Sequence, residues 1–320
     1  MTARRISFVN FKGGVGKTSL AVNFAACLAY GLGQRVLLVD CDSQSNASIW
    51  LMGVPRWNLI NDTPERSVYG IFLKNAPNVY HNVQRSVVED QNHEKLIPTL
   101  DLLPATYRLM DLEHEYVDEK DAPYYYKFYR EVSIFFDQYD YLIFDCPPNV
   151  FRASKCAIFA SQELYVPCNP DVLSYVGLSL LASKVAQFQS ETRPQQRTIP
   201  GYRSARIRGI VLNAVDSKAN YDSVISAMRA KIQFLRSDQV VTEDADILST
   251  YIRRSVQAGK VVGHNLPAIL DKGNPALAED YLNLCRYIHH TPLYREARAA
   301  APAAAQGGKA KANESKRKGK

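Results

Sequence analysis

The sequence lacks an apolar run long enough to cross a membrane. A transmembrane helix needs about 18 or more consecutive apolar residues, and no such run occurs, although 46% of the 320 residues are hydrophobic. Residues 1–5 also lack the apolar core of a signal peptide and lead directly into the first hydrophobic segment. We therefore expect a cytoplasmic protein with a sizeable buried core and no membrane partner.

Cysteine is scarce, and its spacing argues against two kinds of site. The six cysteines contain no C-x-x-C pair, the spacing typical of zinc and redox centres. Several of them, such as Cys27 and Cys146, lie within or beside apolar runs. We interpret them as small buried hydrophobic side chains and not as disulfides or metal ligands.

Net positive charge is almost absent outside the C-terminal tail. The chain has a net charge of +7, and residues 295–320 contain eight basic and two acidic residues. This tail is rich in alanine and glycine and has no aromatic residue, a composition typical of disordered segments. Two interpretations stay open: an electrostatic arm for nucleic acid, or a solvated tail that keeps the protein soluble.

A glycine-rich segment, Phe11–Ser19 (FKGGVGKTS), follows the first hydrophobic segment. Residues 6–9 predict a buried strand, and in residues 20–29 Leu20 and Phe24 share one helical face. Strand, glycine loop and helix are the context of a phosphate-binding loop, because inward N–H groups and the helix N-terminus attract an anion. The predicted nucleotide-binding residues are Gly13, Gly14, Val15, Gly16, Lys17, Thr18 and Ser19, with Lys17 at the β/γ-phosphates and Thr18 as a Mg²⁺ ligand.

Carboxylates end two further predicted strands. The apolar segment 35–39 leads to Asp40 and Asp42, and the apolar segment 139–144 leads to Asp145 and a rigid double proline. Parallel strands gather their carboxyl ends at one edge of a sheet, where open α/β proteins bind ligands. Strand alternation directs Asp40 and Asp42 the same way. We predict that Asp145 holds Mg²⁺ through water.

Together these motifs resemble the ParA/MinD family of ATPases. The family's deviant Walker A box carries a second lysine, here Lys12, and its D-x-D-P-Q-x-N and D-C-P-P boxes are similar to the segments around Asp42 and Asp145. The resemblance implies that Lys12 reaches the partner's nucleotide across an ATP-bound homodimer. It also implies that Lys12, Lys17 and Asp42 are catalytic, with Asp42 orienting the attacking water. Asp40 then holds either the Mg²⁺ shell or the loop.

The resemblance extends from about residue 5 to residue 290. It implies that Asn213, at a predicted strand end, contacts the adenine base; a turn asparagine is the alternative. Segments 250–256 and 263–267 are similar to the family's late strand and the loop near the base. ParA-like members also bind DNA without sequence preference, and the candidates here, unless they are merely solvated, are Arg229, Lys231, Arg236, Arg253 and Arg254.

The order of elements predicts one doubly wound α/β domain over residues 1–294. We expect a mostly parallel sheet with helices on both faces, of the P-loop NTPase type. Residues 51–100 are interpreted as containing an insertion, in which 68–73 is either a short helix or a strand. Other predicted elements are strands at 100–105, 163–167 and 208–213, a helix within 107–129 that packs aromatic side chains on the sheet, a helix at 175–188 and a polar loop at 189–202.

The resemblance implies a ParA-like ATPase that uses ATP and Mg²⁺. Its dimer is expected to bind non-specific double-stranded DNA in the nucleoid, and a ParB-like or cargo-adaptor protein to stimulate its slow hydrolysis. Such a protein segregates or positions DNA or a protein cargo. Two alternatives stay open. A MinD-like membrane-cycling ATPase needs an apolar amphipathic helix, which residues 299–320 do not offer. An ATP-dependent biosynthetic ligase of the same superfamily is disfavoured by Lys12.

Overall fold

A seven-stranded sheet forms the centre of the protein, seen here in a computed structural model. The structure describes residues 2–74, 78–114, 116, 122–255 and 266–293. The order across the sheet is β3-β2-β4-β1-β5-β6-β7, and every neighbouring pair is parallel. The strands are β1 (Arg4–Phe8), β2 (Val36–Asp40), β3 (Leu100–Leu103), β4 (Tyr141–Asp145), β5 (Glu163–Cys168), β6 (Arg206–Val215) and β7 (Val241–Arg253).

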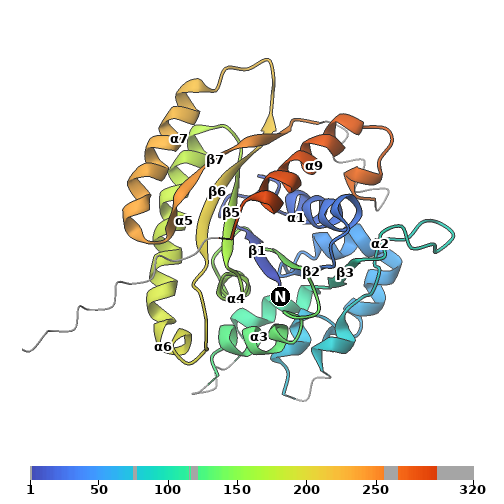
Figure 1. The fold of residues 1–320 in the computed structure, drawn as a ribbon. Coiled ribbons are helices and arrows are strands. Elements are labelled where there is room, and N and C mark those ends of the chain that lie inside the picture. The colour runs from blue at the N-terminus through green and yellow to red at the C-terminus, as the bar shows by residue number, and fades with distance from the viewer. Residues whose placement is uncertain (1, 75–77, 115, 117–121, 256–265, 294–320) are drawn as a thin grey trace, which may run out of the picture.

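Helices cover both faces of this sheet (Figure 1). One face carries α1 (Lys17–Ala26), α2 (Asn46–Asn61) and α9 (Pro275–His290). The other carries α3 (Tyr124–Ser133), α4 (Arg152–Ala160), α5 (Val172–Glu191) and α7 (Asp222–Leu235), with α6 (Arg193–Gln196) directly after α5. The predicted doubly wound α/β fold with a parallel sheet is therefore confirmed.

Short helical turns connect these elements. They are a π-helix at Cys27–Gly31 and 3₁₀ helices at Pro64–Arg66, Val68–Phe72, Val79–Asn82, Tyr107–Glu113, Arg236–Asp238 and Ala268–Leu270. Among the described residues, no helix combines the length and apolar character needed to cross a bilayer.

Helix α1 shows how the local sequence positions the phosphate loop. Leu20 and Phe24 are fully buried, and the ring of Phe24 meets that of Phe8 in β1 edge-on, with 5.5 Å between centroids. The helix ends in a π-turn, Cys27–Gly31. Because α1 packs back over β1, the loop between them is fixed at the carboxyl edge of the sheet.

The structure corrects two predictions about the second half of the chain. The segment 189–202, predicted as a polar loop, is partly helical, because α5 continues to Glu191 and α6 follows it. Strand β7 also begins at Val241, well before the predicted segment 250–256. It is an edge strand whose buried and exposed residues do not alternate regularly, which weakens the period-two signal.

Helix α7 was not predicted, although its sequence contains a helical signal. Met228, Ile232 and Leu235 recur at helical spacing and are its buried residues. The aromatic helix was predicted correctly: α3 buries Tyr124, Tyr125 and Phe128. All six cysteines are buried and free, as predicted.

The segment 51–100 is only partly regular. Helix α2 continues through it to residue 61, with a break at Gly53, where φ is 73°. Residues 68–72 form a 3₁₀ helix, so of the two alternatives for this stretch the helical one is correct. The proposed insertion and the single domain over 1–294 stay predictions, and the tail 295–320 and residues 256–265 lie outside the described residues.

Candidate nucleotide site

The glycine loop between β1 and α1 has the backbone geometry of an anion site. Gly14 and Gly16 have φ angles of 74° and 84°, a region that other residues enter only with strain. Helix α1 begins at Lys17, so its N-terminus faces the loop. The buried Nζ of Lys17 donates to the carbonyl oxygen of Lys12 at 3.0 Å. A phosphate oxygen that enters the loop can take the place of this carbonyl.

Asn213, near the carboxyl end of β6, contacts the same loop. Its Nδ2 donates to the carbonyl oxygen of Val15 at 2.9 Å. A Cβ atom on Gly16 would lie 2.2 Å from this Nδ2, so the close approach requires glycine as much as the φ angle does. The structure thus brings Asn213 to the phosphate loop, and its contact with the adenine base stays a prediction.

Asp40 serves mainly to hold the loop that follows β2. One carboxylate oxygen accepts from the backbone N–H of Asp42 at 3.0 Å; the other accepts from the N–H and hydroxyl of Ser48 at 2.9 and 2.7 Å. Burial raises the pKa of Asp40 to about 7, although these hydrogen bonds oppose the shift. Asp42 is buried and accepts from the N–H of Gln44 at 2.9 Å. Of the two roles predicted for Asp40, its contacts favour the loop.

Asp145 is the carboxylate whose surroundings fit a metal ion. It ends β4 in register with Asp40 and is completely buried. Neither of its oxygens has a hydrogen-bond partner of ordinary geometry among the described residues, although Thr18 lies near enough to lower its pKa. Burial, and then Asp40, raise the pKa of Asp145 well above its ordinary value. A buried carboxylate that lacks donors of ordinary geometry favours a cation, and Mg²⁺ prefers oxygen ligands. Thr18 and Asp145 therefore fit Mg²⁺.

Lys12 leaves its own loop and meets a residue that the sequence predictions missed. Its Nζ donates to Oδ2 of Asp171 at 2.7 Å. Oδ1 of Asp171 accepts from the N–H of Ser174 at 2.8 Å and so caps α5. Burial favours the neutral acid, but the bonds from Lys12 and Ser174 outweigh it and lower the pKa of Asp171. A signal existed, because Asp171 follows a buried strand at the same edge as Asp145.

An exposed apolar surface adjoins this lysine. Leu173, Val176 and Leu180 recur along one side of α5, and each is more than half exposed. Beside them lies a cavity of about 330 Å³, lined in part by Phe11 of the phosphate loop and by Phe151. Apolar side chains gathered in this way are typical of a surface that contacts a partner. We call it the α5 surface, and it comprises Phe151, Val172, Leu173, Val176 and Leu180.

Comparison with known proteins agrees with this geometry. Residues 3–198 match the protein family described as AAA domain. The chain is 31% identical over 283 residues to the sporulation initiation inhibitor protein Soj of Bacillus subtilis, a match that covers 88% of this chain and 97% of that protein. The chain belongs to the ParA/MinD family of ATPases.

Two further matches are consistent with a ParA/MinD ATPase. The chain is 30% identical over 289 residues to the chromosome-partitioning ATPase Soj of Treponema pallidum, covering 89% of this chain and 96% of that protein. The structure of apo McdA from Cyanothece superposes with a TM-score of 0.66, covering 89% of this chain and 99% of that one. At 15% identity, this last likeness concerns the fold alone.

The side chains of four of the five basic residues predicted to bind DNA have partners within the described part of this ParA/MinD chain. Nε and Nη2 of Arg253 each donate to a carboxylate oxygen of Asp280 at 2.7 Å. Arg236 donates to the carbonyl oxygen of Ala245 at 2.7 Å. Nε of Arg229 lies 3.5 Å from Oδ1 of Asp246, and Lys231 lies over the ring of Phe234. The fifth residue, Arg254, is exposed, and the role of all five in DNA binding stays a prediction.

Proposed function

We propose that this chain is a ParA-like ATPase that dimerises when it binds ATP and then binds double-stranded DNA without sequence preference. Slow hydrolysis, stimulated by a ParB-like or cargo-adaptor protein, returns it to the monomer. The observation that carries the proposal is the position of Lys12, which points away from its own phosphate loop to the start of the exposed α5 surface. A second copy seated on that surface would receive this lysine beside its own nucleotide.

The site residues divide the work of hydrolysis. Lys17 and the N–H groups of the loop hold the phosphates, and the buried Asp42 orients water for attack in line with the γ-phosphate. Lys17 and the partner's copy of Lys12 neutralise the negative charge that develops on the transferred group. Thr18 and Asp145 would hold Mg²⁺, which would supply further positive charge for this neutralisation. Because ATP favours the dimer and ADP does not, the nucleotide shifts a population between two states.

The relatives support a role in partition or positioning. One of them, from Treponema pallidum, bears the name chromosome-partitioning ATPase, and it matches along nearly its whole length. We therefore propose that this protein is cytoplasmic, associates with the nucleoid, and segregates DNA or positions a protein cargo. Hydrolysis that increases with DNA, without any small-molecule substrate, would separate this function from that of a biosynthetic ligase.

Fluorescence anisotropy of a random-sequence DNA duplex tests the proposed switch. We expect the full chain to bind at least about tenfold more tightly with ATP than with ADP or no nucleotide. Lys17→Ala removes a phosphate contact and Lys12→Ala removes the contact across the dimer, so both should abolish the ATP-dependent gain. Lys74→Ala, at an exposed position, is the matched control.

The same titration at two salt concentrations, with the full chain and a chain that ends at residue 294, separates the switch from the basic tail. ATP-dependent binding that survives removal of the tail supports the proposal. Binding that ignores ATP and disappears with the tail contradicts it, as does an absence of binding in every nucleotide state.

A further inference from the structure

The amino edge of the sheet, opposite the nucleotide site, carries a cavity of about 980 Å³. Because all strands are parallel, the starts of β1, β5, β6 and β7 come together there. Arg5 of β1, the aromatic side chains of Tyr129 and Phe136, and Arg203 from the segment before β6 form one side of its wall. Residues 291–293, which follow α9, form another. The proposed ATPase cycle uses none of these residues.

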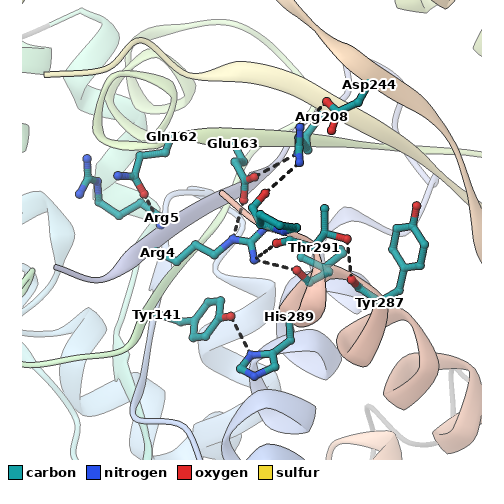
Figure 2. Close-up of polar contacts among 12 residues, drawn as sticks. Arg4, Arg5, Tyr141, Gln162, Glu163, Arg208, Asp244, Tyr287, His289 and Thr291 are labelled. Atoms are coloured by element: carbon teal, nitrogen blue, oxygen red, sulfur yellow. Dashed lines mark hydrogen bonds and ion pairs between the residues drawn. The ribbon is translucent and has the colours of Figure 1, made fainter. Parts of the chain in front are cut away.

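Four charged residues at this edge neutralise one another (Figure 2). Glu163 accepts from Nε of Arg4 at 2.7 Å and lies 3.3 Å from Nε of Arg208. Arg208 also pairs with Asp244. The two arginines further donate to backbone carbonyls at the end of α9 and just after it, namely those of Ile288, Thr291 and Pro292. The network therefore balances its own charges and leaves no acid for a third arginine.

Arg5 stands outside that network. Side chains alternate across a strand, so Arg5 extends to the other face of β1 from Arg4, and Figure 2 shows it directed away from Glu163. Its Cζ lies 4.2 Å from the ring centroid of Phe136, and its Nε donates to the carbonyl oxygen of Ala160 at 2.7 Å. Only 6% of Arg5 is exposed. Within the described part of the chain, no carboxylate pairs with it and no acceptor meets its Nη1 or Nη2.

Arg203 adds a second uncompensated charge at the same cavity. It is exposed, and among the described residues it has no ion-pair partner. Burial lowers the pKa of Arg5, and the neighbouring Arg203 lowers it further. A desolvated cation beside a like charge destabilises the folded protein, and a bound anion would relieve that cost. The guanidinium fork suits one class of anion in particular, the carboxylates and phosphates that accept two parallel N–H bonds.

We propose that this cavity binds a small molecule whose phosphate or carboxylate group is held by Arg5 and Arg203. The cavity is larger than a single ion requires, and Tyr129 and Phe136 give it an aromatic wall. The ligand is therefore an oxyanion that also carries a ring or a flat apolar group. Because Arg5 lies below the surface, the ligand has to enter the cavity, which a rigid DNA duplex cannot do.

Calorimetric titration of the full chain with phenyl phosphate and with benzoate tests this site. The protein is first saturated with Mg²⁺ and ADP so that the phosphate loop is occupied. The two probes share a ring and differ in the oxyanion, so they distinguish a phosphate ligand from a carboxylate; phenol is the uncharged control. We expect saturable binding of at least one probe and none of phenol.

Substitutions then locate the binding. Arg203→Gln removes one charged donor and should weaken binding at least about tenfold. Arg5→Gln should do the same, with thermal melting as a check of its fold. Arg130→Gln, at an exposed position of α3, should leave the affinity unchanged.

Two results would overturn the proposal: no saturable binding of either probe to the unsubstituted chain, or equal affinity after Arg203→Gln. Since Arg203 is exposed, its substitution is decisive even where Arg5→Gln fails to fold. Neither of these results depends on DNA binding or dimerisation, so this proposal and the proposed function fail separately.

Discussion

Asp145 and Asp40 lie side by side at the carboxyl ends of β4 and β2, and both are fully buried. Hydrogen bonds satisfy Asp40, whereas Asp145 has no donor of ordinary geometry among the described residues. Burial raises the pKa of each carboxyl, and the neighbouring Asp40 raises that of Asp145 further. At the scale of residues, it is therefore costly to ionise both carboxylates, and a bound cation would lower that cost.

Asp145→Asn should stabilise the nucleotide-free protein more at pH 8 than at pH 5. A raised pKa in the folded state means that protonation stabilises folding below the ordinary carboxylate range, and this stabilisation is lost as the pH rises through the folded pKa. The amide has no charge to lose, so we expect a gain of about 1–3 kcal/mol at pH 8. Thermal melting in EDTA measures it.

Asp137→Asn is the control for that experiment, because Asp137 is exposed. A gain for Asp145→Asn that is no larger at pH 8 than at pH 5 would contradict the assignment of Asp145 as a buried acid with a raised pKa. If Mg²⁺ and ATP stabilise the unsubstituted chain, Asp145→Asn should lose that extra stabilisation.

At the scale of elements, one ion pair joins the edge strand β7 to α9. Asp280 in α9 accepts from Nε, Nη2 and the backbone N–H of Arg253, at 2.7, 2.7 and 2.9 Å. Three hydrogen bonds to one carboxylate fix the end of β7, which has a strand neighbour, β6, on one side only. The pair therefore supports the sheet at the same edge as the nucleotide site.

Asp280→Asn should destabilise the fold by about 1–2 kcal/mol, because it weakens charge-assisted bonds to a strand end. Urea unfolding measures the difference, and Glu279→Gln, at the exposed neighbouring position, should change stability little. If both variants unfold at the same urea concentration as the unsubstituted chain, the pair contributes nothing and Arg253 is free to serve another function.

At the scale of the whole molecule, the two edges of the sheet carry different surfaces. The carboxyl edge has the phosphate loop and, beside it, the α5 surface; the amino edge has the cavity with Arg5. A parallel sheet makes this separation unavoidable, because all strand ends of one kind lie together. Dimerisation through the α5 surface would leave the amino edge outside the contact.

Leu173→Glu should abolish ATP-dependent dimerisation while the monomer keeps its stability. Leu173 is 70% exposed on the α5 surface, so a charge costs little in the monomer and much in an apolar contact. Leu59→Glu is a matched control, since Leu59 is 69% exposed on α2. Sedimentation velocity with ATP should show dimers for the control only. Dimers of both variants would exclude the α5 surface as the interface.

Local sequence was sufficient to predict the glycine loop, the strands that end in acids and, from these, the fold class. These features depend on contiguous residues: Gly14 and Gly16 need positive φ angles, and a strand or helix is encoded by the period of its own apolar residues. The start of edge strand β7 was predicted too far along the chain, because its buried and exposed residues do not alternate regularly.

Tertiary structure alone decided which charges meet. Lys12 and Asp171 are 159 residues apart in the chain, and Arg4 and Glu163 are equally distant. Asp40, by its contacts, holds a loop, and Arg253 is paired with α9, although both residues matched a functional pattern in the sequence. The physical reason is that a charge acts on whatever lies within a few ångströms, and only the packing of strands and helices sets those distances.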